Sequence, residues 1–255
     1  MRILLTNDDG IHAPGLKSLE KIARALSEDV WIVAPETDQS GVSHSLSLND
    51  PLRLREIADR HYAVRGTPTD CIIMGLRHIM RDNAPDLILS GVNRGQNIAE
   101  DVTYSGTIAA AMEGTLLGVP SIALSQAYGI VGEDRVARWE TAETHGAGIV
   151  DRLLSAGFDG QMLYNVNFPD RAPDDIAGIV ATRQGRRDQA LLEIHERVDG
   201  RGNPYYWLGF NRHRSKPAEG TDLWALYEGF ISVTPLFLDL THQETIARLQ
   251  NLMKA

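Results

Sequence analysis

Residues 2–10 read RILLTNDDG, a short apolar run that stops at one asparagine and two aspartates. The run from Arg2 to Leu5 has the length and the apolar character of a buried strand. A buried strand that leads into an amphipathic helix predicts the first β–α unit of a parallel sheet. The apolar residues that follow the run recur every three or four positions, as one helix face requires: Leu16, Leu19, Ile22, Ala23 and Leu26.

The same alternation of strands and helices continues through the first half of the chain. Thr67 is expected to cap a helix, with Asp70 as its capping-box partner, and Gly118 is expected to end the next helix. Alternation of this kind predicts an α/β fold, a mostly parallel sheet with helices on both faces. The other expected elements are strands at residues 30–34, 87–89 and 120–124, a weaker edge hairpin at residues 52–55 and 62–64, and a helix at residues 107–117.

The second half carries fewer clear signals. We expect a helix at residues 139–154, a strand at residues 162–166, and a hairpin whose two strands meet at the turn-rich residues 199–204. A long polar loop should follow at residues 211–221, and Thr241 and Glu244 should form the capping box of a terminal helix. No linker divides the chain, so residues 1–255 are predicted to form one domain. Its core covers residues 1–130, and residues 131–255 add further core elements, the hairpin at about 190–210 and the terminal helix.

Composition excludes several classes of protein. The 25 basic and 34 acidic residues give a net charge of −9, which argues against binding long nucleic acids through their phosphates. A single cysteine, Cys71, excludes an internal disulfide and a cysteine-cluster metal site, and we expect it in the core. No apolar run approaches the roughly 18 residues of a membrane span, and the N-terminal residues do not resemble a signal peptide. We therefore predict a cytoplasmic protein with no membrane partner.

Polar residues follow three of the predicted strands, at the carboxyl ends where open parallel sheets bind ligands. Asp8 and Asp9 follow the first strand, Ser40 follows the second, and Asn93 follows the strand that ends at Leu89. Oxygen ligands of this kind suit Mg²⁺, Mn²⁺ or Ca²⁺, whereas the histidines and cysteines of a zinc site are absent from these loops. The alternative for two adjacent aspartates is a solvated turn. Their position opposite two other polar loops favours the metal site.

Residues 104–107 read YSGT and precede a helix rich in alanine. Hydroxyl groups and free backbone N–H groups at a helix start can hold a phosphate, so Ser105, Gly106 and Thr107 are candidate phosphate-binding residues. The alternative is a simple Ser/Thr helix cap. The sequence contains no P-loop, no dinucleotide-binding glycine motif and no serine-hydrolase elbow. His12 and His44 lie in loops near this region, and no role is assigned to them.

Five motifs in this order and spacing resemble the survival protein SurE family. They are NDDG at residues 7–10 with APG at 13–15, VAP at 33–35 with QSG at 39–41, GTPTDC at 66–71, SGVN at 90–93, and YSGT at 104–107 with AAAMEG at 109–114. A weaker likeness runs through residues 165–167, 220–222 and 232–236, so the resemblance covers nearly the whole chain. It implies a Rossmann-like, three-layer α/β/α core with a mostly parallel sheet, a C-terminal β-hairpin extension and a terminal helix.

The resemblance also implies a function and assigns roles by position. It implies metal-dependent hydrolysis of nucleoside 5′- and 3′-monophosphates, with some activity on short polyphosphate, by a homodimer or homotetramer. One divalent cation per subunit, Mg²⁺ or Mn²⁺ with Ca²⁺ as an alternative in crystals, would be held by Asp8, Asp9, Ser40 and Asn93. Phosphate would be bound by Asn97, Ser105, Gly106 and Thr107. At residues 94–96 many relatives have smaller residues, and the guanidinium of Arg94 could touch a phosphate or a nucleobase.

Three mechanisms or activities remain open from the residues themselves. The first is attack by a metal-activated water, with Asp8 or Asp9 as the catalytic carboxylate. The second is an aspartyl-phosphate intermediate, which adjacent aspartates favour less than an Asp-x-Asp pair does. The third is a nucleotide-binding module without catalysis. The aromatic residues Tyr205, Tyr206 and Trp207 would be a liability on a free hairpin, so they predict either pairing with another subunit or packing on the chain's own domain.

Overall fold

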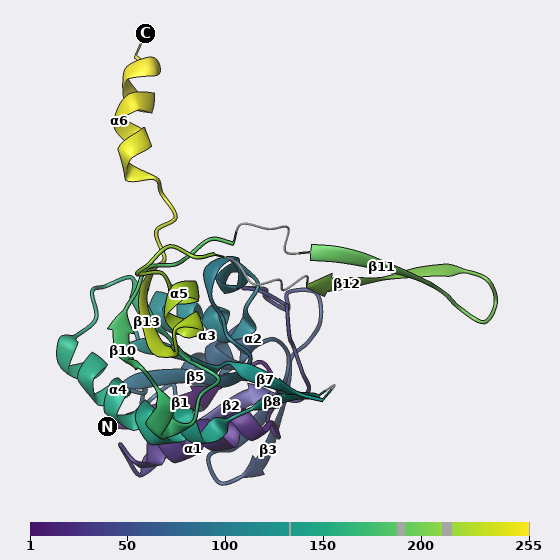
Figure 1. Cartoon of the computed structure of the whole chain (residues 1–255). Coiled ribbons are helices and arrows are strands. Elements are labelled where there is room, and N and C mark those ends of the chain that lie inside the picture. The colour runs from purple at the N-terminus through teal and green to yellow at the C-terminus, as the bar shows by residue number, and fades with distance from the viewer. Residues whose placement is uncertain (133, 188–191, 211–215, 255) are drawn as a thin grey trace.

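The computed structural model describes residues 1–132, 134–187, 192–210 and 216–254 (Figure 1). Its centre is a nine-stranded sheet with the strand order β10-β13-β9-β6-β5-β1-β2-β4-β3. Six consecutive strands of this order are parallel to one another: β1 (Arg2–Thr6), β2 (Asp29–Pro35), β4 (His61–Arg65), β5 (Leu87–Arg94), β6 (Ser121–Gln126) and β9 (Met162–Phe168). The mostly parallel sheet predicted from the strand–helix alternation is confirmed.

Both edges of the sheet contain an antiparallel pair. At one edge β3 (Arg53–Ala58) pairs with β4, which confirms the expected edge hairpin. At the other edge β13 (Phe230–Phe237) runs antiparallel to β9, and β10 (Gly178–Ala181) pairs with β13 in parallel. The second half of the chain therefore completes the same sheet.

Helices cover both faces of the sheet, because alternate residues of a buried strand point to opposite sides. Ile3 and Leu5 pack in the core under α1 (Pro14–Arg24) and α4 (Trp139–Ala156). Leu4 packs in a second core under α2 (Pro68–Met74), the π-helical turn η1 (Gly75–Ile79) and α3 (Gly106–Leu116). This arrangement gives the three layers expected from the sequence, and all three β1 side chains are fully buried.

The remaining elements lie around this body. They are the 3₁₀ turns η2 (Ala99–Thr103) and η3 (Pro173–Asp175), the hairpin of β7 (Tyr128–Val131) and β8 (Asp134–Ala137), the hairpin of β11 (Leu192–Val198) and β12 (Pro204–Phe210), and the helices α5 (Asp222–Tyr227) and α6 (Gln243–Leu252). Figure 1 shows that β11–β12 and α6 project away from the sheet. The predicted hairpin is thus present. None of the helices in the described residues is long and apolar enough to cross a membrane.

Some details differ from the sequence prediction. Residues 90–94 were expected in a loop, but β5 continues through them with a shift of register between Ser90 and Asn93, because strand β6 alongside supplies further pairing. Helix α6 is preceded by His242 rather than Thr241, and no side chain caps it, so the expected capping box is wrong. The capping box of Thr67 and Asp70 is confirmed, with Thr67 Oγ1 accepting from the Asp70 N–H at 3.1 Å.

Two further predictions concern Cys71 and the polar loop. Cys71 is fully buried in the core beneath α2, as expected for a small apolar residue. In the polar loop expected at residues 211–221, residues 211–215 lie outside the described part of the chain. The short strands β7, β8 and β10 and the helix α5 were not predicted, since each has only four to six residues and no clear apolar period.

Candidate active site

The candidate site lies at the carboxyl ends of three neighbouring parallel strands, β2, β1 and β5. The turn after β1 carries Asp8 and Asp9, and it is closed by a hydrogen bond of 2.9 Å from Asn7 Nδ2 to the carbonyl oxygen of Gly10. Gly10 has a φ of +99°, in the left-handed region that favours glycine. The N–H of Gln39, after β2, donates to the Asp8 carbonyl oxygen at 2.8 Å. The backbone therefore holds the first two polar loops together.

Asp8 is the most deeply buried carboxylate of the site, with 4% of its surface exposed. Burial, and after it the adjacent charge of Asp9, raise its pKa to about 7. The hydroxyl of Thr107, on α3, donates to Asp8 Oδ1 and acts in the opposite direction by favouring the charged form. Asp8 is thus fixed in orientation, but it ionises reluctantly unless a positive charge is close.

Asp9 is partly exposed beside it. Its Oδ2 accepts a hydrogen bond of 3.1 Å from the backbone N–H of Arg94 on β5. Burial raises the pKa of Asp9, and the nearby Asp38 carboxylate raises it too, whereas the N–H and the guanidinium of Arg94 lower it. Both aspartates of the pair therefore share a raised pKa for the same two reasons, desolvation and a second carboxylate.

Ser40 faces these carboxylates from the loop after β2. Its hydroxyl donates to Asp38 Oδ1 at 2.6 Å, and its N–H donates to the same oxygen at 2.8 Å. Because the hydroxyl proton is used by Asp38, the lone pairs of Ser40 Oγ remain for a cation. Asp38 was not among the residues that the sequence singled out, although an acidic residue two positions before a serine is typical of a side-chain-closed turn.

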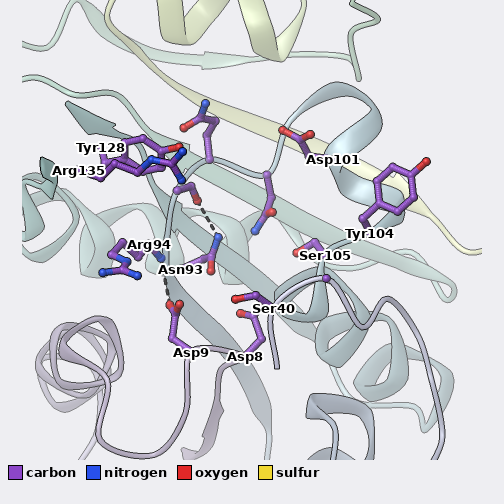
Figure 2. Close-up of a pocket in the computed structure, with 14 residues that line it drawn as sticks. Asp8, Asp9, Ser40, Asn93, Arg94, Asp101, Tyr104, Ser105, Tyr128 and Arg135 are labelled. Carbon is purple, nitrogen blue, oxygen red and sulfur yellow. Dashed lines mark hydrogen bonds between the residues drawn. The ribbon is translucent and has the colours of Figure 1, made fainter. Parts of the chain in front are cut away.

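Asn93 completes the group from β5. Its Nδ2 donates to the carbonyl oxygen of Gly95 at 2.8 Å, and Figure 2 shows its oxygen turned toward Asp8 and Asp9. Fixing the amide nitrogen in this way leaves the oxygen as the group offered to the site. The amide therefore presents an acceptor rather than a donor.

These four side chains fit a hard divalent cation. They offer two carboxylates, a hydroxyl oxygen whose proton is engaged and an amide oxygen whose nitrogen is engaged, which is the donor set of Mg²⁺, Mn²⁺ or Ca²⁺. No cluster of three or more His, Cys, Asp or Glu side chains suited to a metal occurs in the described part of the chain, which does not favour zinc. A cation among these oxygens would also offset the burial and the repulsion that raise both pKa values.

One cavity of about 260 Å³ connects these residues. It brings together six of the eight residues singled out from the sequence, namely Asp8, Asp9, Ser40, Asn93, Asn97 and Ser105. Gly106 and Thr107 do not line it. Thr107 is turned to Asp8 instead, and a Cβ added to Gly106 would lie 2.8 Å from the Asp8 Cβ, so the start of α3 packs closely behind that carboxylate.

Ser105 occupies the N-cap of α3 and lines the cavity. Its Oγ accepts from the Ile108 N–H at 3.1 Å, which confirms a cap. The hydroxyl hydrogen is still available to a ligand, and the partial positive charge of the eleven-residue helix points the same way. The cap and the anion cradle, which were alternatives at the sequence level, are compatible at this residue.

Asn97 is held by a buried network of amides and a hydroxyl. Its N–H donates to Asn167 Oδ1 at 2.8 Å, its Nδ2 donates to Ser125 Oγ at 2.9 Å, and its carbonyl oxygen accepts from Asn165 Nδ2 at 2.8 Å. All four residues are buried, and their strands β6 and β9 are neighbours in the sheet. The second half of the chain therefore positions one wall of the site.

Several residues that line the cavity had no assigned role from the sequence. Asp101, in the turn before Tyr104, is held by Arg187, with 2.7 Å between Asp101 Oδ2 and Arg187 Nη2. This ion pair is almost completely buried and joins two segments 86 positions apart, a separation that sequence patterns do not reveal. The other unassigned lining residues are Gly41, Gly95, Gln96, Tyr104, Tyr128 and Arg135, and Arg94, whose guanidinium the sequence pointed to as a contact for phosphate or base, lines the cavity as well.

The two loop histidines do not line the cavity. His44 Nε2 lies 2.9 Å from Glu113 Oε2 on α3, and His12 is exposed. Among the described residues, neither is placed to act on a ligand in this cavity.

Comparison with known proteins gives a consistent result. The family model described as "Survival protein SurE" matches residues 3–190. A protein named 5′-nucleotidase SurE from Methylobacterium sp. (strain 4-46) is 66% identical over 97% of this chain and 98% of its own length. Its namesake from Azorhizobium caulinodans is 62% identical over the full length of both chains.

A solved structure has the same fold. The crystal structure of SurE protein from Aquifex aeolicus superimposes with a TM-score of 0.83 at 40% identity, covering 99% of this chain and 100% of that one. The similarity therefore includes the projecting C-terminal elements as well as the sheet.

Proposed function

The chain belongs to the survival protein SurE family, and on that basis we propose that it is a divalent-metal-dependent 5′-nucleotidase, which hydrolyses nucleoside 5′-monophosphates to nucleoside and phosphate. The observation that carries the proposal is the convergence of Asp8, Asp9, Ser40 and Asn93 in the lining of one cavity. The proposal extends to 3′-monophosphates and short polyphosphate as further substrates. With a net charge of −9, the substrates are small molecules rather than long nucleic acids.

The four oxygen-bearing side chains would hold one cation per subunit, Mg²⁺ or Mn²⁺. When bound, such a cation supplies polarisation of the phosphoryl oxygens and lowers the pKa of a coordinated water. Asp8 or Asp9 orients or deprotonates the attacking water. Each has one oxygen already fixed by a donor of the protein, from Thr107 and Arg94 respectively, which sets the direction of the other.

The phosphate is bound on the opposite side of the cavity. The Ser105 hydroxyl and the start of α3 offer positive ends of dipoles to the phosphoryl oxygens, and they stabilise charge that develops there during the reaction. Asn97, fixed by the amide network of β9, supports the same group. Gly106 contributes through its backbone and its close approach to Asp8, and Thr107 through its hydrogen bond to that carboxylate.

The proposal is tested with the variant Asp9→Asn, assayed on a 5′-nucleotide with excess Mn²⁺. We expect a loss of turnover of about two orders of magnitude or more, since a ligand and a candidate base are removed together. Asp151→Asn, an exposed residue of α4, makes the same change of charge away from the site and serves as the control. Near-native turnover of Asp9→Asn would contradict the proposal, and nucleotide binding without phosphate release would indicate a binding module.

We also propose a homodimer or homotetramer in which the β11–β12 hairpin packs on another subunit. Trp207 and Leu208 are 63% and 74% exposed, and α6 has no buried residue. Apolar surface of this extent is typical of an interface. We also place the enzyme in the cytoplasm.

A further inference from the structure

Two arginines beside the candidate site have guanidinium groups that form no ion pair and no hydrogen bond with the described residues. Arg94, at the end of β5, and Arg135, on β8, both line the cavity, and neither guanidinium makes a hydrogen bond or ion pair with any described residue. Six other arginines of the described chain form ion pairs of 3.4 Å or less: Arg2, Arg24, Arg55, Arg60, Arg138 and Arg187. In a chain with a net charge of −9, two unpaired cations at one cavity point to an anionic ligand.

The position of Arg135 follows from the β7–β8 hairpin. Arg135 pairs with Ile130 and Ala137 pairs with Tyr128, so Arg135 and Tyr128 lie diagonally on one face. The guanidinium carbon lies 5.1 Å from the centre of the Tyr128 ring, a cation–π contact that restricts the side chain. The base of the hairpin is tied to the body by the ion pair of Arg138 with Asp170, at 3.1 Å.

Arg94 stands on the same side of the site. Its backbone N–H holds Asp9, and the glycine after it permits a close approach to the hairpin: Gly95 has a φ of +128°, and a Cβ there would lie 3.2 Å from Tyr128 Cε1. Figure 2 shows Arg94, Tyr128 and Arg135 together on one side of the pocket, with Tyr104 on the other.

A second cavity opens on this side. Its volume is about 400 Å³, and it shares Asp9, Arg94 and Arg135 with the first cavity. Pro14, Val136 and Trp139 give it a partly apolar wall, which suits a sugar and base. The two arginines therefore lie at the junction between the carboxylates of the first cavity and a space of the size of a nucleoside.

We propose that Arg94 and Arg135 bind a second phosphate group on the substrate, so that the favoured substrate class is the nucleoside 3′,5′-bisphosphates. This inference rests on the proposed nucleotidase function. Water attacks the 5′-phosphorus, the P–O5′ bond breaks, the water oxygen remains on the released phosphate and a proton passes to O5′. The products are inorganic phosphate and a nucleoside 3′-monophosphate, whose phosphate stays between the arginines.

A second phosphate explains the pair of arginines better than a nucleobase does. Guanidinium groups form bidentate hydrogen bonds with phosphate oxygens, and two of them neutralise a dianion. A neutral base would lie against the two exposed guanidinium groups without compensating their charge.

The test compares steady-state kinetics on adenosine 5′-monophosphate, guanosine 5′-monophosphate and adenosine 3′,5′-bisphosphate, with Mn²⁺, for the full-length protein. We expect the unsubstituted protein to favour the bisphosphate by tenfold or more in kcat/KM. Arg94→Met and Arg135→Met should each lose about tenfold in kcat/KM on the bisphosphate relative to the monophosphates, mainly through KM. Arg94→Lys should recover part of the loss. Arg152→Met, on the exposed side of α4, changes the net charge equally and should leave the ratio unchanged.

The outcomes separate this inference from the function on which it rests. If no substrate is hydrolysed by the unsubstituted protein, the nucleotidase proposal fails. If monophosphates are hydrolysed but the bisphosphate is not favoured, or if the substitutions do not change the ratio, the second phosphate site is refuted. If the arginine substitutions lower kcat/KM only on guanosine 5′-monophosphate, the arginines contact the base, and the second phosphate site is refuted as well.

Discussion

Thr107 shows how a single side chain changes its role between sequence and structure. Its position in a YSGT motif at a helix start suggests contact with phosphate, but its hydroxyl instead donates to Asp8 Oδ1 behind the cavity. A buried carboxylate that accepts a hydrogen bond is stabilised in its charged form, the form that binds a cation. The residue would thus act on the proposed cation site through Asp8.

Replacing Thr107 tests this interaction. Thr107→Val removes the hydroxyl at nearly constant volume and leaves Asp8 without its donor, so Mn²⁺ affinity should fall about tenfold or more. Thr107→Ser retains the hydroxyl and should bind Mn²⁺ almost normally. Thr115→Val, on the same helix, removes a buried hydroxyl that donates to the Ala111 carbonyl oxygen and serves as the control. Titration calorimetry measures the affinities, and equal values for the two valine variants would contradict the assigned role.

The raised pKa of Asp8 predicts a pH dependence of the metal-free protein. Its pKa is raised from 3.8 to about 7, so between these values the folded chain keeps a proton that the unfolded chain has released. The contribution of Asp8 to the free energy of unfolding is therefore greatest below about pH 4 and declines as the pH rises to about 7. The variant Asp8→Asn has no carboxyl group at this position, so it lacks this pH-dependent contribution. Urea unfolding in EDTA measures the free energy of unfolding at pH 5 and at pH 8. We expect this free energy to fall more between the two pH values in the unsubstituted chain than in Asp8→Asn. An identical fall in both proteins would contradict the raised pKa of Asp8.

At the scale of elements, the site depends on how three strand ends and one helix start are held together. The turn after β1 is bound to the loop after β2 by backbone hydrogen bonds, and β5 is bound to it through the Arg94 N–H. Helix α3 approaches the turn so closely that only glycine fits at Gly106. The backbone contacts between these elements therefore fix the positions from which the oxygen-bearing side chains of the site extend.

Gly106→Ala tests this close approach. The added Cβ would lie 2.8 Å from the Asp8 Cβ, so either the helix start or the carboxylate must shift. We expect nucleotidase activity to fall tenfold or more, because small displacements of catalytic groups have large effects. Gly148→Ala, on α4 in open space, is the matched control and should be neutral or should raise stability by up to about 1 kcal/mol. Equal activity in both variants would show that the contact is unimportant.

At the scale of the whole molecule, two elements lie outside the sheet and its helices. The β11–β12 hairpin and α6 project from the body, and both expose large apolar side chains. Arg187, only five positions before β11, is buried against Asp101 in the wall of the candidate site. The projecting hairpin is thus attached to the molecule close to the residues proposed for catalysis.

Deleting residues 190–210 tests whether the hairpin mediates assembly. We expect multi-angle light scattering to report a smaller species, because the exposed strands are removed with their apolar surface. Trp207→Ser keeps the hairpin and should weaken the oligomer, whereas Val131→Ser, which is equally exposed on β7, should not. An unchanged oligomer after the deletion would show that the hairpin packs elsewhere.

The sequence alone was sufficient for the strand–helix order of the first half of the chain, the edge hairpin, the Thr67 capping box and the loops that carry Asp8, Asp9 and Ser40. These features depend on local periodicity, caps and turn residues, which neighbouring positions in the chain express directly. The net charge of −9 likewise predicted a small substrate and a cation at the site. Asn93 was selected as well, but as a loop residue rather than part of β5.

Contacts between distant segments were decided by the tertiary structure. The amides of β9 that hold Asn97, the Arg187–Asp101 pair and the donor from Thr107 to Asp8 join residues 70, 86 and 99 positions apart. No local pattern encodes such pairs, because they form only when sheet order and helix packing bring the segments together. For the same reason the two unpaired arginines became a feature of one cavity only once the β7–β8 hairpin was placed beside β5.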